Sequence, residues 1–400
     1  MKILYIWDAD YPWDIRVEKI CNSLNKFGHE VHIASRNLNK LQQYELINGL
    51  HVHRMKFYSN SKLNYIISFP AFFSPVWKIF INNIIEIQKI NAIIVRDLPM
   101  AAAGIWAGKK YNIPVIYDMA EDYCAMIREI WKNRKYHGVN LIVRNPYLAK
   151  IVENYVIDKF NHIVVVTEEA RGIVINEGVN IENISIIGNT PILQIIKNTA
   201  IVKNEDIDFI KSRYGAIYTG GITSDRGISV VIDALPRIIE KIPDFLFVVI
   251  GRGYATEKYL DLIQRRKLQN FVRWIGWVDH DKLYDYIRAS KIGLIPHNVS
   301  DHTNTTIPNK IFDYMVCGIP VVASNAVPMM RIINEEKCGK IFISGKSVSL
   351  ADAIISLYKD DYGYGENGKA AVQNKYNWEN EEITINKIIE HFSIKENTDY

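Results

Sequence analysis

Short apolar runs alternate with amphipathic stretches along the whole chain. The first amphipathic stretch, 15–27, places Val17, Ile20 and Leu24 at helical spacing behind a potential Asp14 cap. The apolar runs are short and rich in β-branched residues, which is typical of buried strands. This alternation predicts two parallel sheets with helices on both faces. The predicted strands are 2–7, 30–34, 51–55, 92–95, 114–117, 162–166 and 184–187 in the first half, and 216–219, 245–250, 271–275, 291–295, 319–323 and 340–343 in the second.

The chain length of 400 residues points to two domains, because single cores rarely exceed about 250–300 residues. We predict two Rossmann-like, doubly wound α/β domains over 1–195 and 205–375, facing across a cleft, with the polar stretch 190–212 as their linker. The amphipathic segment 376–400 is expected to form a C-terminal helix that packs back towards the first domain.

Composition narrows the class of protein. Hydrophobic residues make up 48% and charged residues 23% of the chain, which is typical of a globular protein and excludes a disordered one. The net charge of +4 permits anionic partners but falls short of a nucleic-acid binder. The four cysteines show no CxxC or zinc-type spacing, so we expect reduced thiols and a cytoplasmic protein, with 2–7 as a strand and not a signal peptide.

The segment 65–81, YIISFPAFFSPVWKIFI, is nearly all apolar. Pro70, Pro75 and Lys78 interrupt it, and it is shorter than the roughly 20 residues that a spanning helix needs. Two interpretations remain: burial in a domain core, or contact with a membrane surface. The basic stretch 132–144, with interleaved aromatic residues, could meet anionic lipid or form a solvated face.

Charged residues follow several predicted strands of the first half, where doubly wound sheets bind their ligands. Asp118, Glu121 and Asp122 lie within five positions. Such clustered carboxylates repel one another unless a ligand or hydrogen bonds compensate, so they mark a candidate site; the alternative is a helix capped by Asp118 with a solvated first turn. Further polar residues at strand ends or in the first helical turn are Asp8, Asp10, Asp14, Arg16, Arg96 and Asp97.

The stretch 304–324, NTTIPNKIFDYMVCGIPVVAS, predicts a loop, a helix and a buried strand. Thr305 or Thr306 can cap the helix, and Pro308 suits its first turn. Gly318 and Pro320 should end it. A helix start that opens onto a loop suits a phosphate, and Asp313 could hold hydroxyls of the same ligand, although an ordinary loop–helix–strand unit with a solvated Asp is equally compatible.

Three other segments of the second half follow strands. Gly220 and Gly221 allow a ligand to approach the backbone, with Arg226 as a diphosphate partner, although this motif alone fits a flexible turn with a surface arginine slightly better. Gly251, Arg252 and Gly253 form half of a dinucleotide fingerprint without its third glycine, which disfavours a hydride-transferring enzyme. Trp277 could form a wall for a base or belong to the core. The sequence contains no Walker A, HExxH or GxSxG motif and no metal-ligand motif.

Together these segments resemble glycosyltransferases of the GT-B fold, specifically the retaining glycosyltransferase family four (glycosyl transferases group 1). The resemblance spans nearly the whole chain, and its most specific part is PNKIFDYMVCGIPVVAS. The other matching pieces are D-x-R-V with KFGHEV, YDMAEDY, VVVTEEA, ISIIGN, YTGGITSDRG, VVIGRG and the GWV segment.

The resemblance implies a retaining transfer of a hexose-type sugar from a nucleoside-diphosphate sugar, UDP- in preference to GDP-, to a lipid-linked or surface-polysaccharide acceptor. It implies no metal or other cofactor, no nucleic-acid partner, and peripheral contact with the cytoplasmic face of a membrane. The C-terminal domain would bind the donor and the N-terminal domain the acceptor. The implied roles are catalysis for Glu121 and Asp122, donor binding for Gly220, Gly221, Arg226, Gly251, Arg252, Gly253, Trp277, Thr305, Thr306, Ile307, Lys310 and Asp313, and acceptor binding for Asp14, Arg16, Arg96 and Asp97.

The chain departs from the family pattern at three positions. Thr305 stands in place of the first of two acidic residues, Gly221 in place of a phosphate-binding arginine, and Ala120 in place of a histidine. Asp313 matches the second acid, which binds the donor ribose in the family. These departures leave open two other functions: a nucleotide-sugar epimerase of the GT-B fold, which would need no acceptor, and a non-catalytic nucleotide-sugar-binding homologue.

Overall fold

The computed structural model describes residues 1–12, 14–70, 72–133, 141, 144–194, 204–360 and 362–398. The chain forms two compact units, one made of 1–188 together with 381–400 and the other of 189–380. Much of the predicted linker, 195–203, and most of the basic stretch, 134–140, lie outside the described residues. Each unit is built on its own sheet and has its own core, so each is treated separately below.

Within its described residues, the first unit contains an eight-stranded sheet in the order β3-β4-β2-β1-β5-β6-β7-β8. All pairs are parallel except β3 with β4. Every strand predicted in this half is present, which confirms the doubly wound pattern for this unit. The strands are β1 (Lys2–Asp10), β2 (Glu30–Arg36), β3 (Tyr44–Ile47), β4 (Leu50–Arg54), β5 (Ala92–Arg96), β6 (Val115–Met119), β7 (His162–Val165) and β8 (Ile184–Ile186).

Strand β3 was not predicted. It pairs with β4 through a two-residue turn in which Asn48 and Gly49 both have positive φ, 52° and 84°. An Asn-Gly pair is the standard signal for such a hairpin. The strand itself has alternating exposed and half-buried residues and no buried face, so it lacks the apolar run on which the prediction depended.

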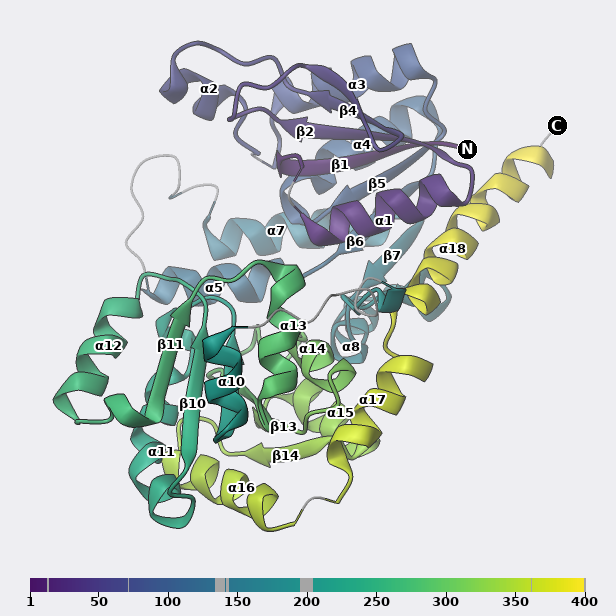
Figure 1. The fold of residues 1–400 in the computed structure, drawn as a ribbon. Helices are drawn as coiled ribbons and strands as arrows, with labels where there is room; N and C mark the ends of the chain where they lie inside the picture. The colour runs from purple at the N-terminus through teal and green to yellow at the C-terminus, as the bar shows by residue number, and fades with distance from the viewer. Residues whose placement is uncertain are drawn as a thin grey trace. The chain divides into compact units, whose positions relative to one another are not determined.

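Helices cover both faces of the first sheet (Figure 1). One face packs into a core formed mainly by α3, α4, α7 and α8, and α1 buries Val17, Ile20 and Leu24. The C-terminal helix lies beside α1, since Glu382 accepts hydrogen bonds from Ser23 and Lys26. The helices of this unit are α1 (Ile15–Lys26), α2 (Ser61–Ile67), α3 (Pro75–Gln88), α4 (Ala101–Tyr111), α5 (Tyr123–Asn133), α7 (Pro146–Val156), α8 (Glu168–Asn176) and α18 (Trp378–Thr398) from residue 381 onwards.

The apolar segment 65–81 divides between core and surface. Trp77 is fully buried and donates its indole N–H to the Ser68 carbonyl at 3.2 Å, and Phe72 is also buried. Phe73 is 50% exposed and Ile79 62% exposed. Burial in the core is therefore confirmed for Trp77 and Phe72, whereas Phe73 and Ile79 lie at the surface of the unit. None of the helices in the described ranges is long and apolar enough to cross a membrane.

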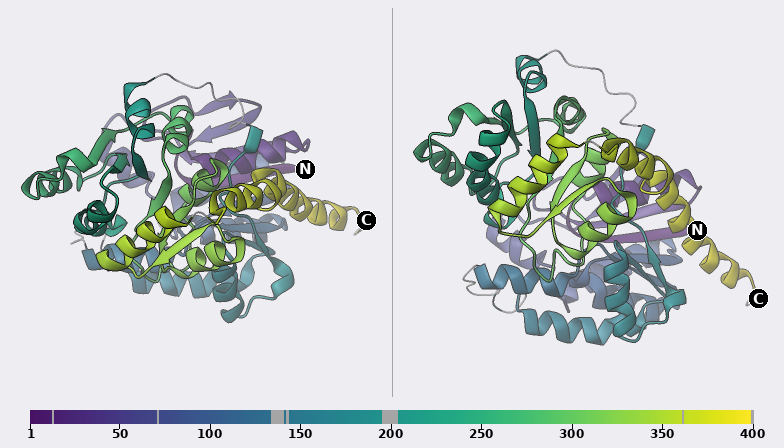
Figure 2. Two further views of the ribbon diagram at one scale, coloured as in Figure 1. Left: turned by 60° about the horizontal axis from the view of Figure 1, so that its bottom comes forward. Right: turned by 90° about the horizontal axis from the view of Figure 1, so that it is seen from below.

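The second unit contains, among its described residues, a six-stranded parallel sheet in the order β11-β10-β9-β12-β13-β14. The strands are β9 (Tyr214–Thr219), β10 (Phe245–Ile250), β11 (Val272–Gly276), β12 (Ile292–Ile295), β13 (Val321–Ser324) and β14 (Gly339–Phe342), and all were predicted. Helices lie on both of its faces (Figure 2). They are α10 (Glu205–Lys211), α11 (Ile228–Lys241), α12 (Thr256–Arg265), α13 (His280–Ala289), α14 (Lys310–Val316), α15 (Val327–Glu336), α16 (Ser347–Lys359) and α17 (Tyr364–Asn374).

Each sheet has one point where the strand order reverses. In the first sheet the chain builds outwards from β1 through β2 and then returns to place β5 on the other side of β1. In the second sheet β9 and β12 have the same relation. The loops that leave neighbouring strands at such a point run in opposite directions and open a crevice at the carboxyl ends, where doubly wound proteins bind ligands. The fold therefore singles out the ends of β1 and β5, and of β9 and β12.

Candidate functional site

A cluster of basic side chains lies at the carboxyl ends of β9 and β12. His297 follows β12, Arg226 follows β9 through its loop, and Lys310 is the first residue of α14. The Lys310 Nζ lies 3.3 Å from His297 Nε2, and the Arg226 Nη1 lies 3.3 Å from His297 Nδ1. Lys310 also sits over the Tyr218 ring, 4.0 Å from its centroid. Three nitrogen groups from three parts of the chain thus converge at the reversal point of this sheet.

The hydrogen bonds and charges of this cluster are not fully satisfied by the three side chains themselves. Neutral imidazole has a single acceptor nitrogen, so His297 cannot accept hydrogen bonds from Lys310 and Arg226 at once. Burial and the Arg226 charge lower the pKa of Lys310 well below its usual value. Burial, Lys310 and Arg226 likewise lower the pKa of His297. Asp225, whose carboxylate lies 3.3 Å from Arg226 Nε, and Asp313 act in the opposite direction on the pKa of Lys310 but do not reverse the shift. A phosphate at this position would add negative charge and acceptor oxygens beside both cations.

Helix α14 brings Asp313 one turn after Lys310. Asp313 Oδ1 accepts a hydrogen bond from the Tyr284 hydroxyl at 3.2 Å, and burial together with the Asp313 charge raises the pKa of Tyr284. The carboxylate is half-buried, so it is held in place and still reachable. Helix α14 ends at Val316, followed by Gly318 at φ 71°, which confirms the predicted helix stop.

The predicted cap of α14 is wrong. The helix begins at Lys310 with Asn309 at the N-cap position, and the hydroxyls of Thr305 and Thr306 both donate to the His302 carbonyl, at 3.0 and 3.1 Å. Thr305 is the last residue of a turn over 301–305, and the hydroxyls of both threonines stabilise that turn and not the helix start. Pro308 also lies before the helix and not in its first turn. Thr305 is buried, and Ile307 packs against the core of the second unit.

The glycines at the ends of β9 and β10 serve mainly to bring two backbone segments together. A Cβ on Gly251 would lie 1.8 Å from the Gly220 carbonyl oxygen, and one on Gly253 would lie 2.1 Å from the Ile222 carbonyl oxygen. Gly251 and Gly253 therefore allow one backbone segment to approach another. A Cβ on Gly221 would meet open space, so this is the glycine of the group that leaves room for a ligand.

Trp277 lies directly after β11 and is 59% exposed, so it does not belong to the core. Arg252 is also exposed. Both residues belong to loops at the carboxyl edge of the sheet. Arg252 follows β10, the neighbour of β9, and Trp277 follows β11, the next strand beyond it. An exposed indole at this edge offers an apolar face on which a planar ring can stack.

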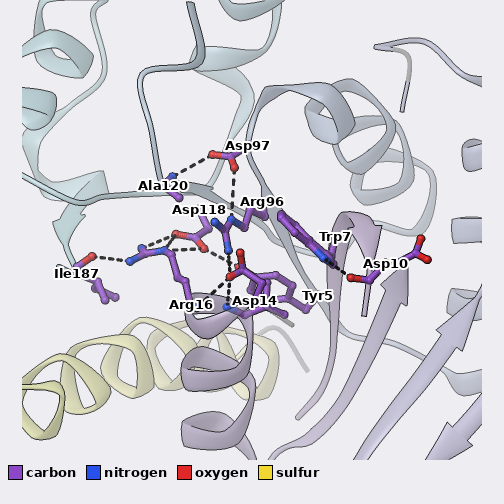
Figure 3. A network of polar contacts seen from close by, with 11 residues as sticks. Tyr5, Trp7, Asp10, Asp14, Arg16, Arg96, Asp97, Asp118, Ala120 and Ile187 are labelled. Atoms are coloured by element: carbon purple, nitrogen blue, oxygen red, sulfur yellow. Dashed lines mark hydrogen bonds and ion pairs between the residues drawn. The ribbon is translucent and has the colours of Figure 1, made fainter. Parts of the chain in front are cut away.

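In the first unit, a buried ion pair joins α1 to β6 (Figure 3). The Arg16 guanidinium donates to both carboxylate oxygens of Asp118, at 2.6 to 3.1 Å, and to the Ile187 carbonyl at 2.9 Å. The Tyr5 hydroxyl donates to the same carboxylate at 2.6 Å. Arg16 and Asp118 are 3% and 1% exposed. This placement argues against the predicted contact between Arg16 and an acceptor: its guanidinium holds Asp118 inside the fold.

Arg96 and Asp97 lie at the end of β5, above this ion pair (Figure 3). Arg96 contacts the carboxylates of Asp14 and Asp97 and stacks over the Trp7 ring at 4.6 Å. Asp14 caps α1, as predicted, by accepting from the Arg16 and Val17 N–H groups.

Two carboxyl groups at this edge titrate near neutral pH. Burial raises the pKa of Asp97 to about 7. The Arg96 charge lowers this pKa, whereas the charges of Glu121 and Asp118 raise it further. Burial also raises the pKa of Asp8 to about 6. Asp97 has φ 55°, which is uncommon for a residue other than glycine and is typical of residues held in place at functional sites. The β1–β5 edge therefore carries groups that can accept or donate a proton.

The three clustered acids of the first unit have different environments. Asp122, and not Asp118, caps α5: its carboxylate accepts the Ala125 N–H at 2.8 Å and is 8% exposed. Asp118 is the buried partner of Arg16. Glu121 is half-buried and close enough to Asp97 to raise the pKa of that carboxyl. Glu121 is therefore the most accessible member of the predicted group.

The sequence placed Asp8 and His297 at strand ends without a specific role, and it did not single out Tyr284. Each occurs in a segment that was examined, but its importance depends on contacts with Lys310, Asp313 or Arg96. The position of His297 two residues after β12 is a usable signal, because it is the same kind of strand-end position that identified Asp97.

Two family models match the chain. The model described as Glycosyltransferase Family 4 matches residues 15–190, and the model described as Glycosyl transferases group 1 matches residues 213–360. An uncharacterized glycosyltransferase from Methanocaldococcus jannaschii is 24% identical over 94% of this chain and 93% of its own length. A phosphatidyl-myo-inositol mannosyltransferase from Mycobacterium leprae is 30% identical over 38% of this chain, and the match spans 40% of that relative's length.

Solved structures share the fold over nearly the whole chain. Sucrose-phosphate synthase from Thermosynechococcus elongatus superposes with a TM-score of 0.75 at 16% identity, covering 98% of this chain and 99% of that one. The Anabaena protein HepE in complex with UDP-glucose superposes with a TM-score of 0.68 at 16% identity, covering 98% and 100%. At this level of identity the likeness concerns the fold.

Proposed function

Because the chain belongs to the GT-B glycosyltransferases of the family 4 and group 1 type, we propose that it transfers a hexose-type sugar from a nucleoside-diphosphate sugar, with UDP preferred over GDP. The acceptor in this proposal is a lipid-linked or surface-polysaccharide intermediate, and the transfer retains the anomeric configuration. The second unit would bind the donor and the first unit the acceptor.

The basic cluster of Arg226, His297 and Lys310 carries this proposal. Its position at the β9–β12 reversal point is where a doubly wound sheet binds a ligand, and its converging nitrogen donors suit an anion. The diphosphate of the donor supplies that anion. When the sugar leaves, negative charge grows on the diphosphate, and Arg226 and Lys310 are placed to stabilise it without a metal ion.

The remaining donor contacts follow from the neighbouring loops. Asp313, oriented by Tyr284, would accept hydrogen bonds from the ribose hydroxyls. The exposed Trp277 would stack on the base, and the open space at Gly221 would admit the phosphates. Backbone N–H groups near Thr305 and Thr306 would face the sugar in place of the missing family carboxylate. Solved HepE structures contain UDP and UDP-glucose, which supports a uridine donor.

The reacting hydroxyl of the acceptor would meet the acids of the first unit. We assign Glu121 to orientation of the acceptor or the sugar, and Asp97 to a hydrogen bond with the same hydroxyl, since the pKa of Asp97 is raised to about 7. Asp122 holds the start of α5 and so acts by positioning Glu121. The retaining step in this proposal is a front-face displacement, in which the departing phosphate takes the proton of the acceptor.

The names of two relatives support a lipid-linked acceptor. One is the phosphatidyl-myo-inositol mannosyltransferase already described. The other is a chitobiosyldiphosphodolichol beta-mannosyltransferase from Candida albicans, 25% identical over 39% of this chain and 35% of its own length. Both matches cover only part of those relatives, so the acceptor class stays a proposal to be tested.

The first prediction tests the donor. UDP-sugars should raise the thermal midpoint of the purified protein more than GDP- or ADP-sugars do, because a ligand that binds only the folded state stabilises it. With the best donor, Arg226→Ala and Asp313→Ala should each weaken binding at least tenfold, and Arg237→Ala, in an exposed ion pair with Asp352, should not. Full donor binding by both site variants would contradict the site, and stabilisation by none of the nucleotide sugars would contradict the function.

An exposed aromatic cluster supports contact with the membrane. Phe73 stacks on Trp106 at 5.4 Å and contacts the Tyr155 ring at 6.3 Å, and Lys78 lies 4.9 Å above the Trp106 ring. These residues come from α3, α4, α7 and the turn before α3, all in the first unit. Aromatic rings beside a lysine are the usual combination of side chains at a lipid interface.

The second prediction tests this contact. The protein should float with vesicles that contain anionic lipid, and Phe73→Ser should lower its partition coefficient roughly tenfold, since a buried aromatic ring contributes about 1.5–3 kcal/mol. Ile394→Ser, at a 65% exposed position of α18, serves as the matched control and should float as the wild type does. Equal flotation of Phe73→Ser and the wild type would show that the cluster does not dock on lipid.

A further inference from the structure

A second cluster of polar side chains lies far from the reversal points, on β2 and β4. It consists of Glu30, His32, His51 and His53, with Tyr44 of β3 beside them, and we call it the histidine cluster. His32 and His51 are direct partners in the parallel register of β2 and β4, and their rings stack with centroids 4.6 Å apart. Glu30 precedes His32 by two residues, so both side chains lie on the same face of the sheet. Figure 1 shows β2 and β4 side by side.

The geometry points to a metal site: we propose that Glu30, His32 and His51 bind one Zn²⁺ ion. One ligand atom from each of the three residues lies within 4.8 Å of the others. Glu30 Oε1 and His32 Nε2 are already 3.0 Å apart. A tetrahedral Zn²⁺ with bonds of about 2.1 Å holds its ligands about 3.4 Å apart, so small side-chain rotations close the site.

The outer nitrogens of both imidazoles have the partners that a metal site requires. With His32 bound through Nε2, its Nδ1–H can donate to His53 Nε2, which lies 3.0 Å away. The His51 Nδ1 lies 2.9 Å from the Tyr44 hydroxyl, which leaves Nε2 as the ligand atom. Such outer contacts fix the tautomer and the ring orientation of a metal-binding histidine.

The donor set selects the kind of ion. Two imidazoles and one carboxylate suit Zn²⁺, whereas Mg²⁺ and Ca²⁺ prefer oxygen ligands throughout. Three protein ligands leave one position for water. Lys2 now contacts Glu30 Oε1 at 2.8 Å, and both side chains are about 40% exposed, so the ion displaces only a weak surface pair.

The location separates the ion from the groups assigned to the reaction. Glu30 is the first residue of β2 and His51 the second of β4, so the cluster lies at the amino ends of these parallel strands. The groups assigned to the reaction, Asp97 and Glu121, follow the carboxyl ends of β5 and β6, at the opposite edge of the sheet. Zn²⁺ would fasten β4, and through it the antiparallel β3 hairpin, to the rest of the sheet. The sequence contains no short metal-binding motif for this site, because its ligands lie on two strands. His32 and His51 are 19 residues apart in the sequence.

The third prediction tests the site directly on the full-length protein after removal of metals with EDTA. One Zn²⁺ should bind per chain and raise the thermal midpoint, and Co²⁺ in its place should give the visible spectrum of a four-coordinate ion. His51→Ala should weaken Zn²⁺ binding at least tenfold, and Tyr44→Phe, which keeps all ligands but removes the outer partner of His51, should weaken it about tenfold. His391→Ala, on an exposed face of α18, is the matched histidine control and should bind as the wild type does.

The thermal midpoint measured without metal distinguishes a loss of Zn²⁺ binding from a loss of folding stability. His51→Ala should unfold at the wild-type temperature in EDTA, since the metal is absent from both proteins. Zn²⁺ binding by His51→Ala at wild-type affinity would place the ion elsewhere and overturn the proposal, as would a Co²⁺ spectrum that is identical in the two proteins. If His51→Ala fails to fold, Tyr44→Phe alone decides, and wild-type affinity in that variant would count against the site.

Discussion

Lys310→Met should abolish most donor binding and leave the protein as stable as the wild type or more so. The ammonium group would make a charge-assisted contact to the diphosphate, and its loss should cost about 2–3 kcal/mol, a roughly 30- to 150-fold weaker Kd. In the ligand-free protein the same charge is unfavourable, because burial and Arg226 lower the pKa of Lys310. Methionine keeps the length of the side chain over the Tyr218 ring and removes that penalty.

Donor binding should also take up protons through Lys310. Its pKa is lowered in the free protein and rises when the diphosphate binds, so affinity is highest below the free-state pKa and falls as the pH rises above it. Calorimetric titration in two buffers with different ionisation enthalpies measures this uptake. Lys310→Met should show no proton uptake from this group.

Lys340→Met is the control for this experiment. Lys340 also lies over tyrosine rings, 5.2 Å from the centroid of Tyr364, but on β14 at the edge of the sheet. It should bind the donor with wild-type affinity. Wild-type affinity in Lys310→Met, or a large loss of its thermal stability, would contradict the assignment of Lys310 to the diphosphate.

Asp118→Asn should destabilise the first unit by about 3–5 kcal/mol, the largest stability effect we expect from a single substitution of this chain. The substitution leaves the Arg16 guanidinium buried, 3% exposed, without its counter-charge. Asparagine keeps the volume, so the loss reports on charge and not on packing. Denaturant unfolding followed by circular dichroism measures it, and Arg16→Ala combined with Asp118→Asn should cost less than the sum of the two.

The matched control is Asp352→Asn. Asp352 also accepts two N–H groups of one arginine, Arg237, at 2.7 and 3.0 Å, but both side chains are more than half exposed. Water solvates the arginine that remains, so the expected loss is below about 1 kcal/mol. Equal losses in Asp118→Asn and Asp352→Asn would mean that the Arg16–Asp118 pair is not buried in solution.

The pH dependence of this ion pair has a definite sign. Burial raises the pKa of Asp118, but Arg16 outweighs it, and the net pKa lies below the usual value. A carboxyl group whose pKa is lowered by folding stabilises the protein above its unfolded pKa of about 3.9, and this contribution is lost as the pH falls through the folded value. The wild type should therefore lose this stability in acid, whereas Asp118→Asn should show a flatter profile there.

The sequence predicted the strands of both sheets in the described residues, except for the edge strand β3. Central strands such as β10 are buried on both faces, so each appears in the sequence as a continuous apolar run. Such a run can be recognised as a strand without knowledge of its neighbours. The edge strand β3 has no such run, and its Asn48-Gly49 turn became informative only once pairing with β4 was known. The cap of α14 was missed for a similar reason, since the Thr305 hydroxyl had a local competitor in the His302 carbonyl.

Sequence by itself determined which residues stand at strand ends, and the rule for parallel sheets then predicted that they meet at one edge. That reasoning, together with the predicted loop–helix start, identified Arg226 and Asp313 as candidates, and the family resemblance added Lys310. Only the tertiary structure decided how each one is used: it placed His297 between Lys310 and Arg226, and it buried Arg16 against Asp118 where a ligand contact had been expected. The physical reason is that periodicity along the chain follows local backbone geometry, whereas burial and pKa depend on side chains that are distant in sequence, such as Arg16 and Asp118.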